Sequence, residues 1–201
     1  MNIDKLFSNK KKFYTTKELK NLSISNYLTH KLIAAGKLSK INTSLYENKD
    51  YLGEDSDFAY ASALVPKGVI CLISAAIYYN LTTARPDEIS IAIERTQKTS
   101  KLPDWPPISI IYYSKKRFET GVNTFFDSGQ KINIYDVEKT VIDIIFYRNK
   151  IGIEETKEIL KNYLLKPERN LNKLYRYATQ LNCKNIINTY LEVLLWQVLH
   201  L

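Results

Sequence analysis

Residues 15–37 read TTKELKNLSISNYLTHKLIAAGK, and this stretch decides how the N-terminal part of the chain folds. Thr15 and Glu18 have the spacing of a capping box, in which each side chain accepts a hydrogen bond from the backbone N–H group of the other residue. We therefore expect a short helix to begin here. A turn over residues 23–25 should follow it, with Ser25 as the N-cap of the next helix.

The second helix is indicated by its apolar residues. Leu28, Leu32 and Ile33 recur at helical spacing, so they form one buried stripe. Gly36 is placed to adopt the left-handed conformation that commonly ends a helix. The sequence thus predicts two helices joined by a tight turn.

A short hairpin follows these helices. Residues 38–41 and 45–46 can pair as two strands around the turn at Asn42, Thr43 and Ser44. Helix, tight turn, helix and small β-hairpin are the order of a winged helix-turn-helix. We expect this domain to occupy residues 1–49.

The charge of the chain is concentrated at this end. The net charge is +8, and residues 1–49 hold ten lysines against Asp4, Glu18 and Glu47. This density predicts a surface for a polyanion, and in this fold the second helix enters the major groove of DNA while lysines neutralise phosphates. Winged helices also serve as protein-interaction modules, so that alternative stays open. The expected base contacts are Ser25, Asn26, Tyr27, Thr29 and His30, and the expected phosphate contacts are Lys10, Lys11, Lys12, Lys17, Lys20, Lys31, Lys37, Lys40, Thr43 and Ser44.

An acidic, aperiodic linker is expected at residues 50–57, followed by a second domain at 58–201. The apolar residues of this second domain alternate between helical and strand periodicity, which predicts an α/β (α+β) fold with a small sheet and C-terminal helices. The expected strands are 88–94, 108–113, 121–127 and 131–135, and the expected helices are 58–65, 69–80, 137–147, 153–165, 170–181 and 185–199.

Composition argues against several classes of protein. Two distant cysteines, no apolar leader and no long apolar stretch favour a cytoplasmic protein without a membrane partner. With two histidines, no glycine-rich phosphate loop and no nucleophile elbow, we expect no catalytic residues, no metal and no cofactor.

Two acidic patterns in the sequence are spaced like catalytic carboxylates. Asp55 and Asp57 have the spacing of a nucleotidyltransferase pair, but no glycine-serine step precedes them, so they are interpreted as solvated charges. Asp87 and Glu94 are spaced loosely like nuclease carboxylates, although the lysine that helps hold Mg²⁺ and water is missing. A Mg²⁺-dependent nuclease is kept as an alternative to a protein without enzymatic activity.

Three groups of segments carry a family resemblance. They are FYTTKEL with LIAAGKL and Leu45–Tyr46 (residues 13–19, 32–38 and 45–46), PKGVICLISAA with LTT (66–76 and 81–83), and KTVID with YRNKIG (139–143 and 147–152). Together they resemble the AbiEi-type antitoxins of bacterial type IV toxin–antitoxin systems, which act in abortive infection and phage defence. The resemblance implies that the winged helix binds inverted repeats in its own promoter and represses it. It also implies that the second domain counters a nucleotidyltransferase-fold toxin without a stable complex. A stand-alone transcriptional regulator of a phage-defence locus is the alternative.

The chain departs from the family at the tip of the wing. Thr43 and Ser44 stand where the family usually has an Arg-Gly step, so one cationic DNA contact is lost. In the second domain, Lys139 and Asp143 have the i,i+4 spacing of an ion pair. We favour a buried brace over a surface that meets the toxin or its RNA substrate. The residues expected to matter there are Lys67, Lys139, Asp143, Tyr147 and Arg148.

Overall fold

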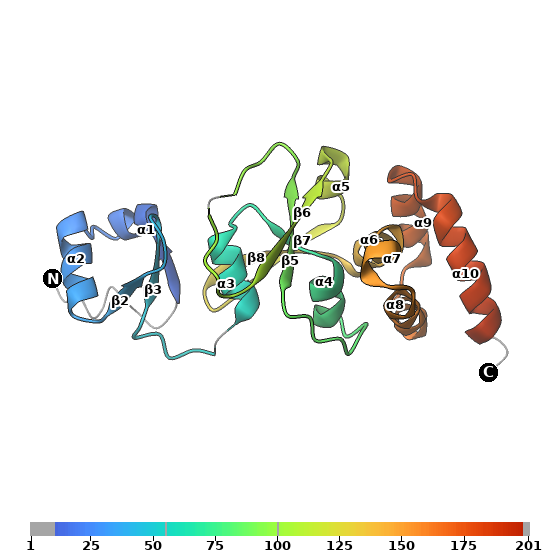
Figure 1. The fold of residues 1–201 in the computed structure, drawn as a ribbon, viewed down its shortest axis with the longest axis horizontal. Coiled ribbons are helices and arrows are strands. Elements are labelled where there is room, and N and C mark those ends of the chain that lie inside the picture. Colours follow the sequence, from blue (N-terminus) through green and yellow to red (C-terminus); the bar gives the residue numbers. More distant parts are fainter. Residues whose placement is uncertain (1–10, 55, 100, 199–201) are drawn as a thin grey trace. The chain divides into compact units, whose positions relative to one another are not determined.

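The computed structural model describes residues 11–54, 56–99 and 101–198, and its architecture is mixed α/β, as predicted (Figure 1). The chain forms two compact units, and segments from the middle of the sequence alternate between them. The first unit ends at Gly68 and adds Lys98–Ile108 and Thr124–Ile132. The second comprises Val69–Gln97, Ser109–Asn123 and the residues from Asn133 onward.

A three-stranded antiparallel sheet and two helices begin the first unit. The strand order is β1-β3-β2, with Phe13 opposite Glu47 and Lys40 opposite Tyr46. The two predicted strands are confirmed, whereas the first strand was not predicted, because its three residues are ordered by pairing with a strand distant in sequence. The elements are β1 (Phe13–Thr15), α1 (Thr16–Asn21), α2 (Asn26–Ala34), β2 (Leu38–Lys40) and β3 (Leu45–Asn48).

The expected helix caps are present. Thr15 Oγ1 accepts the N–H of Glu18 at 3.2 Å, and the Thr15 N–H donates to Glu18 Oε2 at 2.7 Å. Ser25 Oγ accepts the N–H of Leu28 at 3.2 Å, and Gly36 has a φ of +72°. These local signals fix both ends of α2, and its apolar side packs on a core of Tyr14, Leu19, Ile24, Leu32 and Leu38.

Helix α3 (Asp57–Leu64) belongs to the first unit. Its Tyr60 ring stacks on Phe13 of β1, with centroids 4.8 Å apart and planes at 21°. The unit therefore extends past the expected linker at residues 50–57, because this ring contact joins α3 to the sheet.

A five-stranded sheet has the order β6-β5-β4-β8-β7. Its central strand β4 pairs antiparallel with β5 and parallel with β8. The predicted helix over residues 69–80 is wrong at its start, because Val69 and Ile70 form β4 and are buried on both faces, where a continuous apolar run suits strand and helix equally. The strands are β4 (Val69–Ile70), β5 (Ile89–Glu94), β6 (Ile108–Tyr113), β7 (Val122–Asp127) and β8 (Gln130–Tyr135).

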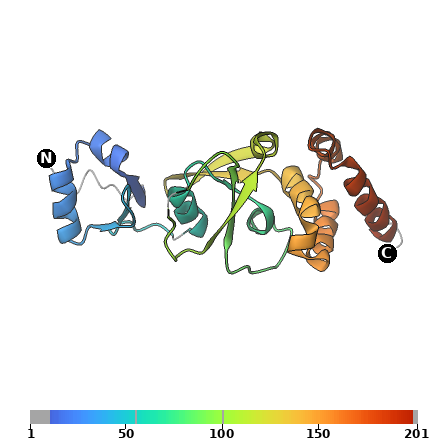
Figure 2. The ribbon, with the colours of Figure 1, turned by 45° about the horizontal axis from the view of Figure 1, so that its top comes forward.

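Helices gather at the C-terminal end of the second unit (Figure 2). Helix α6 is buried along nearly its whole length and contacts α4, α8, α9 and α10. The predicted long helices are confirmed, while two short ones were not predicted. In order they are α4 (Leu72–Tyr78), α5 (Lys115–Glu119), α6 (Val137–Phe146), α7 (Arg148–Ile151), α8 (Ile153–Leu165), α9 (Leu171–Gln180) and α10 (Lys184–Val198). Among the described residues, none of the helices combines the length and apolar character needed to cross a membrane.

Candidate nucleic-acid interface

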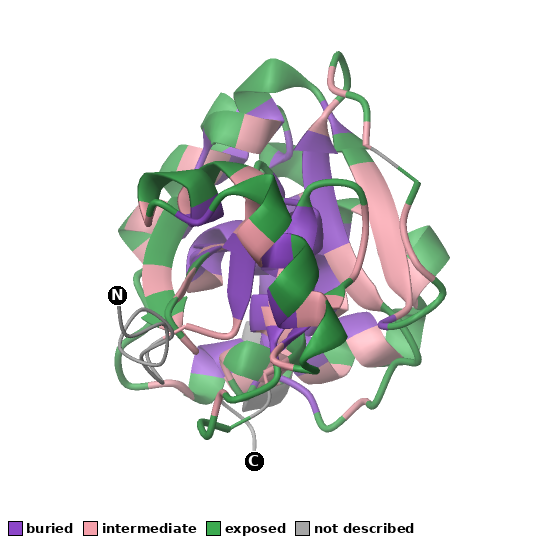
Figure 3. Ribbon diagram, turned by 90° about the vertical axis from the view of Figure 1, so that its left-hand side faces the viewer, coloured by how far each residue is buried: buried purple, intermediate pink, exposed green. Residues whose placement is uncertain are grey.

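The N-terminal end of α2 consists mostly of exposed polar residues. Figure 3 colours the ribbon by the burial of each residue. Ser25, Asn26 and His30 are exposed, and Tyr27 is 70% exposed. Asn26 and His30 are four residues apart and lie on one stripe of the helix, while Tyr27 and Lys31 form a second stripe. Four of the five expected base contacts are thus accessible.

Thr29 is the exception and corrects the prediction that it points outward. It is 6% exposed, and its hydroxyl donates to the backbone carbonyl of Ser25 at 3.0 Å. A threonine inside a helix commonly satisfies its hydroxyl in this way, one turn back along the backbone. Its side chain lies on the buried side of α2, with its hydroxyl turned back to the helix backbone.

A hollow of about 200 Å³ lies between α2, the start of α1 and the β2–β3 hairpin. Residues expected from sequence to contact bases and residues expected to contact phosphates meet here, although they lie up to seventeen positions apart. None of the lining residues is acidic. The lining residues are Thr16, Asn26, Thr29, His30, Ile33, Lys40, Thr43 and Tyr46.

The hairpin tip is organised by one side chain. Asn42 Oδ1 accepts the backbone N–H groups of Ser44 and Leu45, both at 2.9 Å. Thr43 and Ser44 are therefore exposed on a closed turn, as their expected contact with phosphate requires. The role of Asn42 was missed, although an asparagine that caps a turn two residues onward is a recognisable signal.

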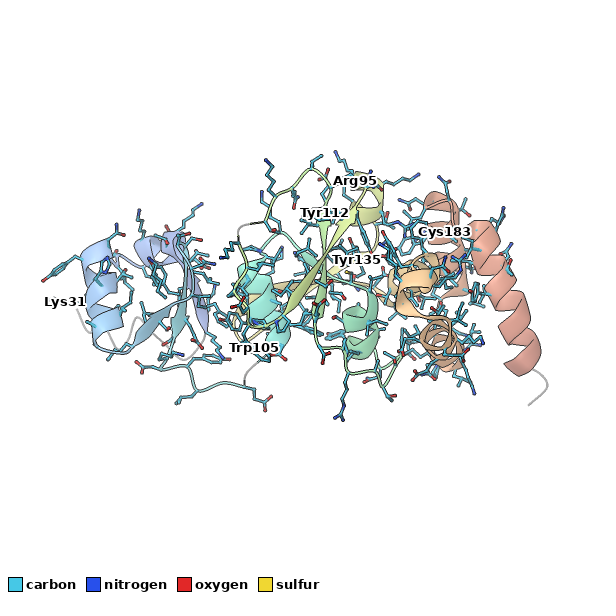
Figure 4. The ribbon with its side chains drawn as sticks, in the orientation of Figure 1. Lys31, Arg95, Trp105, Tyr112, Tyr135 and Cys183 are labelled. Carbon is cyan, nitrogen blue, oxygen red and sulfur yellow. The ribbon has the colours of Figure 1, made fainter. Side chains whose placement is uncertain are left out.

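Several of the expected phosphate-binding lysines are exposed. Lys31 projects from α2 with its Nζ 4.9 Å from the centroid of the Tyr27 ring, which positions both side chains (Figure 4). Lys37 is half-buried. Among the lysines described in this unit, the exposed ones on α1, α2 and β2 are Lys17, Lys20, Lys31 and Lys40.

The lysine arm expected at residues 10–12 is corrected in part. Lys11 is half-buried and forms an ion pair with Glu18, and Lys12 Nζ lies 3.7 Å from Glu47 Oε1. Burial alone would raise the pKa of Glu18, but hydrogen bonds from Lys11 and Thr15 hold it below its usual value. These two lysines balance carboxylates of the fold, while Lys10 lies outside the described residues.

A buried charge cluster occupies the core of the second unit. Lys139 and Asp143 are fully buried and form the expected ion pair. Arg117 of α5 pairs with the other oxygen of the same carboxylate, with its Nη1 2.5 Å from Asp143 Oδ1. Its Nη2 donates a hydrogen bond to Cys183 Sγ at 3.3 Å. The arrangement is a brace within the unit, so neither Lys139 nor Asp143 is available to a partner.

Aromatic rings complete the cluster. Lys139 Nζ lies 4.0 Å from the Tyr135 centroid and 4.9 Å from the Tyr113 centroid, and Figure 4 labels Tyr135 and Cys183. Burial lowers the pKa of Lys139, although Asp143 opposes that change. Burial also raises the pKa values of Tyr113 and Tyr135, with Asp143 adding to the effect. The cluster therefore favours neutral tyrosines around one shared carboxylate.

The other residues expected to matter in the second domain lie in different settings. Lys67 is exposed after α3. The ring of Tyr147 is half-buried and stacks on Tyr113 with centroids 5.8 Å apart. Arg148 is half-buried and donates to the carbonyl of Ile145 at 3.1 Å. Sequence reasoning missed Arg117, because no local spacing connects it to a helix that begins twenty residues later.

The carboxylates considered for a nuclease are not adjacent. Asp87 precedes β5 and Glu94 ends it, so an extended strand separates them by roughly 20 Å. They cannot share one Mg²⁺ ion. In the part of the chain that the structure describes, no three histidine, cysteine or acidic side chains are grouped as metal ligands.

No family model matches the chain, and a search of curated proteins also finds no match.

Proposed function

We propose that this chain is a type IV antitoxin that represses its own operon by binding promoter DNA through a winged helix-turn-helix. One observation carries the DNA-binding half: α2 presents an exposed polar end beside a hairpin, and the hollow between them contains no acidic residue. The antitoxin half rests on the resemblance at residues 66–83 and 139–152.

The geometry of α2 suits duplex DNA. An α-helix fits the major groove, and its N-terminal residues are the ones that approach base edges. Asn26 can bond the N6 and N7 atoms of adenine with its amide, and Ser25 can bond several bases. Tyr27, held by Lys31, offers an apolar ring edge to a thymine methyl group. Sequence preference would thus come from three successive residues.

Affinity would come from the exposed lysines. Each lysine that neutralises a phosphate releases condensed counterions, which strengthens binding at low salt without adding sequence information. The hairpin tip, closed by Asn42, would place Thr43 and Ser44 against the backbone. The absence of an arginine at this tip leaves more of the affinity to α1 and α2.

The second unit would supply antitoxin activity against a nucleotidyltransferase-fold toxin. Its buried brace of Lys139, Asp143 and Arg117 would hold α5 and α6 together rather than contact the toxin. Exposed Lys67 and half-buried Arg148 remain as residues that a toxin or its RNA substrate could reach.

Two experiments test the proposal. Affinity selection of the purified chain against a library of random-sequence duplexes should enrich an inverted repeat, and that repeat should lie upstream of this gene. Co-expression with a nucleotidyltransferase-fold toxin encoded in the same operon should restore growth that the toxin alone prevents.

The outcomes separate the alternatives. Enrichment and promoter repression without rescue of growth would support a stand-alone regulator and contradict antitoxin activity. Failure to enrich any duplex would contradict DNA binding. Mg²⁺-dependent cleavage of nucleic acid by the purified chain, abolished by Asp87→Ala, would support a nuclease instead.

A further inference from the structure

The hollow beside α2 contains a polar group whose hydrogen bonding is incomplete. Thr16 Oγ1 is shielded from solvent and has no hydrogen-bond partner among the described residues. Its backbone is fixed, since the Thr16 N–H donates to the carbonyl of Ser44 at 2.9 Å. Leaving a buried hydroxyl without a partner is unfavourable, so such groups in native proteins commonly have a ligand or water to satisfy them.

Cationic and neutral donors line the same hollow. Lys40 at the end of β2 is exposed and lines the hollow, and no carboxylate in the described part of the chain pairs with it. Thr43 brings a second hydroxyl from the hairpin tip, and His30 brings an imidazole from α2. A site with several donors and a positive charge, and no acidic side chain, favours an anion.

The helix orients its residues for two different tasks. Asn26 and His30 are on the stripe that faces the hairpin, since both line the hollow, while Tyr27 and Lys31 are on the other stripe. His30 was expected to read bases, but its position in the hollow sets it beside the hydroxyls and Lys40. Its imidazole can therefore donate to a backbone phosphate oxygen from this side of the helix.

We infer that this hollow binds one phosphodiester of duplex DNA, held by the Lys40 ammonium group and the hydroxyls of Thr16 and Thr43, with His30 at its edge. The inference rests on the proposed DNA-binding function and adds a residue, Thr16, that the sequence did not single out. A phosphate held at one point of the backbone would fix the register of α2 in the groove. Asn26, at the N-terminal end of the same stripe, would then meet a defined base.

The test uses the full chain and the duplex that affinity selection enriches. Each phosphate of one half-site is replaced in turn by an uncharged methylphosphonate, and the dissociation constant is measured by fluorescence anisotropy. The wild-type chain should lose about tenfold or more in affinity at one position, as expected for a charge-assisted contact. Lys40→Gln and Thr16→Val should bind more weakly and be insensitive to the replacement at that same position.

Matched variants separate contact from folding. Thr16→Ser keeps the hydroxyl and should recover both affinity and sensitivity at that phosphate. Lys20→Gln removes an exposed lysine of α1 outside the hollow, and should stay sensitive to the replacement. Circular dichroism should show equal helix content for all four variants.

The results distinguish this site from DNA binding in general. Duplex binding in which no phosphate position couples to both Lys40 and Thr16 would overturn the inference and leave the proposed function intact. Failure of the wild-type chain to bind any duplex would overturn both. If Lys40→Gln became insensitive to the methylphosphonate replacement while Thr16→Val stayed as sensitive as the wild-type chain, the role of the buried hydroxyl would be overturned.

Discussion

Arg117 and Asp143 lie 26 positions apart in sequence, yet Arg117 Nη1 is 2.5 Å from Asp143 Oδ1 in the core of the second unit. Asp143 is fully buried and also pairs with Lys139, so one carboxylate neutralises two cations. Removing one partner of a buried ion pair is costly, because the remaining charge is left without water or counterion.

Asp143→Asn should therefore destabilise the chain strongly. The asparagine keeps the shape of the side chain but leaves two buried cations, and we expect the free energy of unfolding to fall by about 3–5 kcal/mol. Urea denaturation followed by circular dichroism measures it. Glu154→Gln, which breaks an exposed pair with Lys157, should change little. A loss for Asp143→Asn no larger than that of this control would show that the brace carries no stability.

Alkaline pH should unfold the second unit cooperatively. Burial raises the pKa of Tyr79 to about 12 and those of Tyr113 and Tyr135 well above their ordinary value. Above pH 10 the unfolded chain ionises these tyrosines while the folded chain does not, so stability present at lower pH is lost. The lowered pKa of Lys139 makes stability rise with pH, which is the opposite effect. This effect ends above about pH 10.5, because the lysine is then neutral in both the folded and the unfolded chain.

Each such tyrosine should contribute a slope of about 1.4 kcal/mol per pH unit. Urea midpoints measured across this pH range test it, with tyrosinate absorbance as a second signal. Tyr135→Phe loses the hydrogen bond to the Phe118 carbonyl at 2.9 Å. It should also reduce the slope of stability against pH by the contribution of one tyrosine. An unchanged slope would mean that Tyr135 ionises equally in the folded and unfolded chains.

Acid should loosen the first unit through Glu18. The pKa of this carboxyl is lowered by its partners Lys11 and Thr15, so its contribution is present above about pH 4.5 and is lost as the pH falls below that value. Hydrogen exchange of the α1 and α2 amides should quicken in acid, and Glu18→Gln should exchange faster already at neutral pH with a weaker pH dependence. Glu88→Gln, an exposed carboxyl outside this unit, serves as the control. Identical pH profiles for all three chains would contradict the role of Glu18.

Local signals predicted most of the fold, and long-range pairing explains what they missed. The capping box at Thr15, the N-cap at Ser25 and the left-handed Gly36 depend on neighbouring residues and were correct. Strand β4 was assigned to a helix, because two apolar residues between other strands carry no period of their own.

The candidate site shows the same division. The exposed tip of α2 was predictable from helical spacing. The burial of Thr29 was not, because its hydroxyl donates a hydrogen bond to the backbone carbonyl of Ser25. Lys139 and Asp143 could be paired by their spacing, but Arg117 comes from another helix and has no signal in the sequence near them. The lysines before β1 were expected to be free because Glu47, which approaches Lys12, is distant in sequence.

Asn26→Ala should relax sequence preference with little change in affinity for unrelated duplexes. The amide is exposed at the N-terminal end of α2, where a bidentate contact with adenine discriminates by about 1–3 kcal/mol. Affinity selection with the variant should give a less defined consensus at one position of each half-site. Ala34→Ser, a substitution at the exposed C-terminal end of the same helix, should keep the wild-type consensus. An equally sharp consensus for Asn26→Ala would mean that another residue reads that base.

Lys31→Gln and Lys11→Gln should differ in their effect on salt dependence. Lys31 is exposed on α2, so its loss should reduce the slope of log affinity against log salt by about 0.9, the value for one phosphate. Lys11 is already balanced by Glu18, so Lys11→Gln should leave the slope nearly unchanged while lowering the stability of the first unit. Fluorescence anisotropy at increasing salt measures the slopes, and urea denaturation measures the stabilities. Equal losses of slope for both variants would show that Lys11 leaves its carboxylate partner to bind DNA, and the folded ion pair would then be a resting state of the free protein.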